Sequence, residues 1–198
     1  MSTARSPSHF TARDYATWSG DWELHAGEAV AMTPSPFGRH GELLSRMAAI
    51  LWNAIDKAGC HATVLADVDW IVSPDTVVRP DLSVVCGPAP EGHLTEPPAM
   101  IVEILSVATR DRDLSFKQSL YAAHGVAWYL TLDADVPDRP AATLRHHATP
   151  ASPSPSTTVF NAPQTPTAPT TIKLCPECTI TMDFDWLEPH RPSKAKPT

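Results

Sequence analysis

The chain has 198 residues, of which 42% are hydrophobic and 19% charged, and its formal net charge is -7. This length supports one well-buried core but is short for two domains. The acidic balance argues against binding nucleic acid through a broad basic surface. No apolar run approaches the roughly 18 residues of a membrane helix, so we expect a cytoplasmic protein without membrane contact. One domain is predicted at residues 18–190, between a loose arm at 1–17 and a tail at 191–198.

The first predicted elements follow the polar arm, which could also hold a short helix. Residues 22–32 read WELHAGEAVAM, and this pattern predicts two short strands around a turn at Ala26-Gly27. From residue 42 to 58 apolar side chains recur at helical spacing and a glycine follows. This segment is predicted to be an amphipathic helix.

Strands dominate the middle of the chain. Alternating apolar residues predict one strand at 62–72. A second strand is predicted at 77–87 and a third, largely apolar and buried, at 99–106. Helical spacing then returns at 109–123, and the apolar run at 126–133 predicts a fourth strand.

The C-terminal third is predicted to contribute two more short strands. One is expected at 142–147 and the other at 170–174 or 179–184. Between them, residues 148–170 are rich in Pro, Ser and Thr, which is typical of a loop and excludes a continuous core element.

Four scattered cysteines do not resemble the disulfide framework of a small secreted protein. Cys175 and Cys178 form a single CxxC pair. A structural zinc site needs a second pair, and only distant histidines could complete this one. Ordinary thiols in a loop or at a strand edge are therefore favoured over zinc.

Glu103 interrupts an apolar strand, where an ionised carboxylate is costly unless a metal ion, a cation or hydrogen bonds compensate for its burial. The alternative is a solvent-facing glutamate on an edge strand or a structural ion pair. Asp81 follows Pro80 at a strand entrance, whereas Asp75, in a similar Pro-Asp pair, is assigned to a turn. If the strands of Asp81 and Glu103 pair, their carboxylates can converge on one Mg²⁺ or Mn²⁺ ion.

The helix predicted at 109–123 offers a positively charged side chain for this site. Asp113, Lys117 and Tyr121 recur at four-residue intervals and share one face. Lys117 is either the cation of the site or one member of a surface pair with Asp113. Arg110 and Arg112 would add to a local positive cluster that could face phosphate.

Several segments together resemble the Uma-two family of restriction endonucleases, in the PD-(D/E)XK nuclease superfamily. They are RPDLSVV at 79–85, IVEILS at 101–106 and DRDLSFKQSLYAAHGVAWYLTLD at 111–133. The segment at 22–40 is also similar to the N-terminal half of that family. The resemblance implies an α/β restriction-endonuclease-like core, with a central mixed β-sheet flanked by the two predicted helices.

In such nucleases the motif aspartate and glutamate hold Mg²⁺, and a lysine orients the attacking water or stabilises charge on the phosphate. The resemblance therefore assigns Asp81 and Glu103 to the metal. Leu105 stands where the motif lysine would be, so Lys117 is the candidate replacement. Glu28 and His40 match polar positions of the family, so the resemblance makes them candidate supporting residues of the site. The alternative for Glu28 is an exposed strand residue, and the alternative for His40 is a residue at the start of a helix.

The expected function is Mg²⁺-dependent hydrolysis of nucleic-acid phosphodiesters, with DNA favoured over RNA on family grounds. One alternative is a catalytically inactive module of the same fold that binds nucleic acid or protein. Another is a metal-dependent hydrolase for a different phosphoester. A homodimer is compatible with this class, and the sequence does not decide it.

Overall fold

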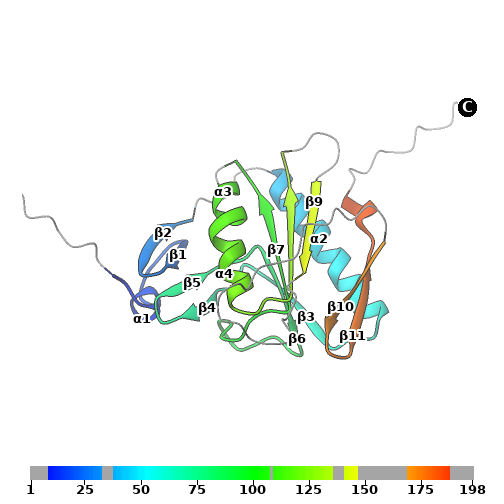
Figure 1. Cartoon of the computed structure of the whole chain (residues 1–198), viewed down its shortest axis with the longest axis horizontal. Coiled ribbons are helices and arrows are strands. Elements are labelled where there is room, and N and C mark those ends of the chain that lie inside the picture. The colour runs from blue at the N-terminus through cyan, green and yellow to red at the C-terminus, as the bar shows by residue number, and fades with distance from the viewer. Residues whose placement is uncertain (1–8, 33–37, 108, 136–140, 147–168, 188–198) are drawn as a thin grey trace, which may run out of the picture.

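The computed structural model describes residues 9–32, 38–107, 109–135, 141–146 and 169–187 (Figure 1). A five-stranded sheet forms the centre, in the order β3-β6-β7-β8-β9, with β7 and β8 parallel and the other neighbours antiparallel. Its strands are β3 (Ala62–Ala66), β6 (Leu82–Cys86), β7 (Met100–Leu105), β8 (Trp128–Asp133) and β9 (Ala141–His146). The predicted mixed central sheet is confirmed.

A second, antiparallel sheet lies beside the first, in the order β2-β1-β5-β4. Its strands are β1 (Trp22–His25), β2 (Glu28–Ala31), β4 (Trp70–Ser73) and β5 (Thr76–Val78). The β1–β2 hairpin turns at Ala26 and Gly27, both of which have positive φ, as the sequence predicted for this turn.

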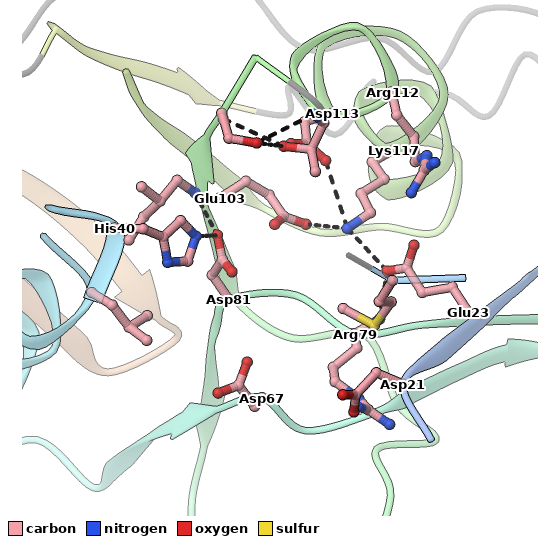
Figure 2. Close-up of a pocket in the computed structure, with 15 residues that line it drawn as sticks. Asp21, Glu23, His40, Asp67, Arg79, Asp81, Glu103, Arg112, Asp113 and Lys117 are labelled. Carbon is pink, nitrogen blue, oxygen red and sulfur yellow. Dashed lines mark hydrogen bonds and ion pairs between the residues drawn. The ribbon is translucent and has the colours of Figure 1, made fainter. Parts of the chain in front are cut away.

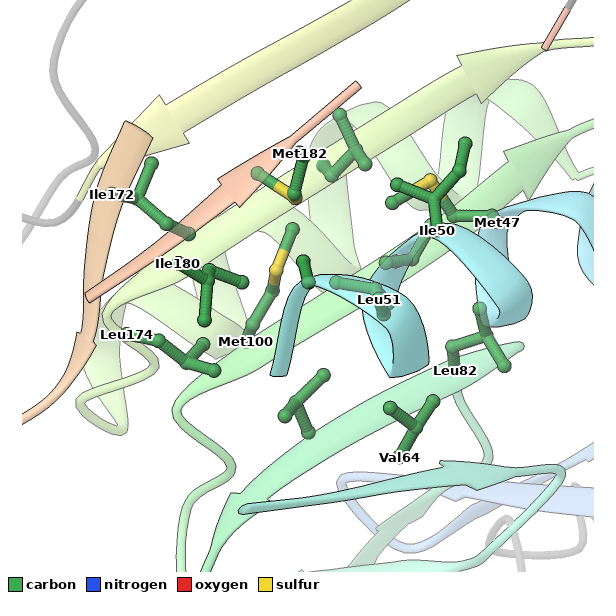
Figure 3. Packing of buried hydrophobic residues seen from close by; sticks show 14 of the residues in the cluster. Met47, Ile50, Leu51, Val64, Leu82, Met100, Ile172, Leu174, Ile180 and Met182 are labelled. Atoms are coloured by element: carbon green, nitrogen blue, oxygen red, sulfur yellow. The ribbon is translucent and has the colours of Figure 1, made fainter. Parts of the chain in front are cut away.

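Helices cover the two faces of the central sheet. On one face, α2 (Gly38–Lys57) buries a stripe of residues at helical spacing against the sheet and against β11 (Figure 3). On the other face, Tyr121 and Ala122 of α4 (Gln118–Ala123) pack with Ile101 and Tyr129 of the sheet. Strand β7 is buried along its whole length, which explains its nearly continuous apolar sequence.

The predicted helix at 109–123 is continuous but not uniform. It begins as α3 (Arg110–Arg112), widens into a π-helical segment (η1, Asp113–Lys117) and ends as α4. π-Helical turns are rare in proteins, and those that occur often lie at functional sites.

Two predicted strands are each divided in the structure. The segment at 62–72 breaks at Asp67, which has a φ of 53°, so β3 joins the central sheet and β4 the second sheet. The segment at 77–87 breaks at Arg79-Pro80 into β5 and β6, because proline cannot donate a ladder hydrogen bond. The chain thus passes from one sheet to the other and back, which the alternating pattern alone did not reveal.

The described part of the predicted N-terminal arm is folded. Helix α1 (Ala12–Tyr15) carries a capping box, and the hydroxyl of buried Tyr15 donates to Asp69 at 3.0 Å. Residues 1–8, the predicted tail and nearly all of the predicted 148–170 loop lie outside the described residues.

The C-terminal part forms a β10–β11 hairpin (Thr170–Cys175 and Cys178–Met182) followed by a 3-10 turn (η2, Phe184–Leu187). Both candidate segments for the last strand are therefore strands. All four cysteines are paired, Cys60 with Cys178 and Cys86 with Cys175, so the expectation of ordinary free thiols is wrong. The sequence separations of 118 and 89 residues explain why the pairs could not be read from spacing. No helix among the described residues is long and apolar enough to span a membrane.

Candidate active site

A cavity of about 400 Å³ opens where the two sheets meet (Figure 2). Its wall combines residues of β1, α2, β7 and the π-helical segment with the two places where the chain crosses between the sheets. Acidic side chains outnumber basic ones in this wall. The acids are Asp21, Glu23, Asp67, Asp81, Glu103 and Asp113, and the bases are His40, Arg79, Arg112 and Lys117.

Asp81 and Glu103 lie side by side on neighbouring strands (Figure 2). The β6–β7 register pairs Leu82 with Val102, so one step further along each strand brings Asp81 opposite Glu103. The Asp81 carboxylate is fixed by the backbone N–H of Ile104, which donates to Oδ2 at 2.6 Å. The predicted convergence of the two carboxylates is present in the structure.

His40, near the start of α2, faces the same carboxylate. Its Nε2 lies 3.4 Å from Asp81 Oδ2. A hydrogen bond to Asp81 is the largest cause that raises the pKa of His40, and burial opposes it. The contact with Asp81 therefore favours the charged form of His40.

Glu103 is almost fully buried, with 3% of its surface exposed. Its Oε1 accepts hydrogen bonds from Tyr121 Oη at 2.6 Å and from Lys117 Nζ at 3.1 Å. Burial is the largest cause that shifts the pKa of Glu103 and raises it above its usual value; Lys117 lowers this pKa, while the charges of Asp81 and Asp113 raise it further. The net effect of these surroundings favours the neutral form of Glu103.

Lys117 is buried among three carboxylates and is no surface residue. Its Nζ lies 3.0 Å from Glu23, 3.1 Å from Glu103 and 3.6 Å from Asp113 (Figure 2). Burial by itself lowers the pKa of Lys117, but the three carboxylates outweigh it and raise that pKa. Lys117 therefore stays protonated and acts as a fixed positive charge, not as a base.

Glu23 was missed from the sequence, although it is only 1% exposed. Its carboxylate interacts with Lys117 and His25 and accepts the backbone N–H of Arg79 at 2.9 Å. Burial raises the pKa of Glu23, but Lys117 and the His25 hydrogen bond prevail and lower it to about 2. The available signal was a charged residue between Trp22 and Leu24 in a short predicted strand. Strict alternation with these apolar neighbours would place Glu23 on the solvent face, although it is buried.

Other predicted residues are not brought to the site. Glu28 is exposed on β2 and is not part of the cavity wall. Arg110 is bound to Asp133 through both terminal nitrogens, at 2.6 Å each. Of the predicted positive cluster, Arg112 and Lys117 line the cavity, whereas Arg110 is not part of its wall and pairs with Asp133.

The carboxylate pair fits a hard divalent cation. Among the described residues, no donor contacts the second oxygen of Asp81 or of Glu103, and the surplus of acids would be neutralised by such an ion. With the four cysteines paired in disulfides, the same part of the chain shows no group of three or more His, Cys, Asp or Glu side chains that could hold a metal ion. Mg²⁺ is commonly bound by one or two carboxylates, with water and substrate oxygens completing the shell, so two carboxylates are sufficient.

The fold and this arrangement define a restriction-endonuclease-like α/β protein with a carboxylate pair and a buried lysine where its two sheets meet. The chain belongs to the Uma2 family, described as "Putative restriction endonuclease", whose model matches residues 12–174. The predicted family and fold are thereby confirmed.

A solved structure shows the same fold. It is the crystal structure of a putative nuclease belonging to DUF820 from Anabaena variabilis ATCC 29413, with a TM-score of 0.63 and 18% sequence identity. The match covers 90% of this chain and 99% of that chain. No curated protein matches the sequence.

Proposed function

We propose that this protein is an endonuclease that depends on Mg²⁺ or Mn²⁺ and hydrolyses nucleic-acid phosphodiester bonds, with DNA favoured over RNA. The observation that carries the proposal is the placement of Asp81, directly before β6, beside Glu103 of the paired strand β7 and next to the buried ammonium of Lys117. Membership of the Uma2 family supports the same activity. We further propose a cytoplasmic location, and a homodimer is compatible with this function.

Asp81 and Glu103 would hold the metal ion, which when bound lowers the pKa of a water molecule and neutralises phosphate charge. The backbone N–H of Ile104 and the side chain of His40 fix the orientation of the Asp81 carboxylate. Tyr121 and Lys117 do the same for Glu103 through its Oε1, so that no donor among the described residues occupies its second oxygen.

Lys117 contributes a fixed positive charge beside the reacting phosphate. Because its pKa is raised, it cannot accept a proton from water, and its effect is electrostatic. Arg112 lines the same cavity and makes no ion pair with a described residue, so it is the side chain best placed to contact a phosphate oxygen.

The test is a cleavage assay on single-stranded DNA, double-stranded DNA and RNA, with Mg²⁺, with Mn²⁺ and with a chelator. Asp81→Asn and Glu103→Gln keep the size of each side chain and remove its charge, while Glu28→Gln is a matched control outside the cavity. We expect cleavage that requires the metal, is lost in both site variants and persists in the control. Full activity in folded Asp81→Asn or Glu103→Gln protein would refute the proposed site.

A second readout separates the nuclease from an inactive binding module of the same fold. Calorimetric titration with Mn²⁺ and equilibrium binding to labelled DNA are measured on the same preparations. Binding of DNA with no metal binding and no cleavage under any condition would favour the module.

A further inference from the structure

The four cysteines converge at one place, although they come from four separate points of the chain. Cys175 and Cys178 are direct partners across the β10–β11 hairpin. Cys86, at the end of β6, pairs with Ala62 of β3, and Cys60 stands two residues before Ala62. The hairpin lies beside α2 and the β3 side of the central sheet (Figure 1).

The strand registers bring the sulfur atoms together in two pairs. Residues directly opposite in an antiparallel pair project to the same face, so Cys175 and Cys178 point the same way from their two-residue turn. Cys60 lies in the turn between α2 and β3, where its N–H donates to Ile55 O, and its disulfide with Cys178 brings it to the hairpin. The two disulfides then join one pair to the other, across Cα–Cα distances of 5.4 and 6.0 Å.

This arrangement supplies the second pair of cysteines that a zinc site needs in addition to the CxxC pair. A structural zinc site takes four tetrahedral thiolates, typically with two of them from a tight CxxC turn. Here Cys175 and Cys178 provide the turn, and the second pair is Cys86 at the end of β6 and Cys60 in the turn before β3. Four thiolates leave no open position, so such a site would be structural and not catalytic.

The surroundings of the cluster suit a structural role. Cys175 and Cys178 are 8% and 4% exposed and belong to the main hydrophobic core, and Cys60 packs against it. Cys86 is exposed, which leaves an approach from solvent. One ion bound here would fasten the C-terminal hairpin to the central sheet.

We propose that these four cysteines form a zinc tetrathiolate site, and that the two disulfides are the oxidised, metal-free form of the same cluster. Two molecules of a dithiol reductant convert the two disulfides into four thiols and are themselves oxidised to cyclic disulfides. Binding of Zn²⁺ then releases the four thiol protons to water. The proposal does not depend on nuclease activity, and a reducing compartment would favour the thiol form.

The test uses the full chain, expressed in bacterial cytoplasm and purified anaerobically without chelator. Elemental analysis is expected to find one zinc per chain and no stoichiometric iron. A mercurial reagent that caps thiols should release that zinc, in proportion to the thiols modified, to a chromogenic chelator. Replacement of zinc by Co²⁺ should give the intense visible absorption of a tetrahedral thiolate site.

Variants identify the ligands. Cys86→Ser and Cys178→Ser remove one ligand from each pair and are expected to lose most of the bound zinc. His61→Ala is the matched control, because His61 follows Cys60 directly and is the nearest alternative ligand in sequence; it should keep its zinc. If the serine variants do not fold, the mercurial and Co²⁺ measurements on the unaltered chain decide the matter.

Three outcomes would overturn the proposal. The first is anaerobically purified protein that lacks stoichiometric zinc and does not take it up after reduction. The second is protein whose four cysteines remain resistant to alkylation as two disulfides under these conditions. The third is zinc that is bound in full after all four thiols have been capped.

Discussion

Glu23→Gln tests whether the buried lysine is held in place by the second sheet. The substitution keeps the size of the side chain and removes its charge, so Lys117 retains only Glu103 and Asp113 as counterions. A hydrogen bond to a charged group contributes about 1.5–3 kcal/mol to stability. Glu23 is 1% exposed, so solvent screening does not reduce this value much.

The lowered pKa of Glu23 gives a second value for the free energy that its charge contributes to folding. Its fall from the usual 4.5 to about 2 corresponds to about 3 kcal/mol of stability. Because the folded-state pKa is lowered, this stabilisation is present in full above the unfolded pKa of 4.5 and is lost as the pH falls toward about 2. We therefore expect Glu23→Gln to reduce the free energy of unfolding by about 2–3 kcal/mol at neutral pH, and by about half as much at pH 3, because pH 3 lies between the folded and unfolded pKa values.

Urea denaturation at the two pH values, followed by fluorescence, measures this difference. Asp21→Asn is the matched control, because Asp21 pairs with Arg79 at 2.9 Å but its side chain is 60% exposed. That control should change stability by less than about 0.5 kcal/mol. A similarly small effect of Glu23→Gln, or one that does not depend on pH, would refute the reasoning.

Three further substitutions test other parts of the structure. Tyr121→Phe removes the 2.6 Å hydrogen bond to Glu103 and should lower the free energy of unfolding by about 1.5 kcal/mol, as measured by denaturation. In cleavage kinetics the same variant should lower kcat more than it changes KM. Leu51→Ala leaves a cavity beneath the fully buried face of α2 and should cost about 3 kcal/mol in the same unfolding assay. Glu28→Gln should change neither stability, beyond about 0.5 kcal/mol, nor cleavage, and a large loss of activity in this variant would return Glu28 to the site.

The central part of the fold could be predicted because its sequence signals are local. Strand β7 is a short run that is apolar except at Glu103, and α2 has a long stripe at helical spacing, so both elements were identifiable from the local sequence. Glu103 stood out for the same reason, since a carboxylate inside such a run must have partners. Asp81 could be placed next to it because adjacent strands in sequence commonly pair.

Other features depend on contacts between distant residues and could not be read in this way. The strand breaks at Asp67 and at Arg79-Pro80 assign neighbouring segments to different sheets, and alternation continues across each break. Glu23 is buried only because the second sheet packs beside the π-helical segment that carries Lys117. The cysteine cluster likewise exists only once the C-terminal hairpin packs on the central sheet.

The position of Lys117 explains how the site can lack a lysine on the strand of Glu103. Leu105 lies two residues after Glu103, on the same face of β7, and is buried there. The ammonium instead arrives from the π-helical segment and reaches Glu103 Oε1 at 3.1 Å. A lysine on a helix could adopt many positions, and it is Glu23 from the second sheet, together with Asp113 from its own helix, that restricts it to this one. The second sheet is therefore part of the proposed catalytic machinery, because it fixes the charge that Glu103 requires.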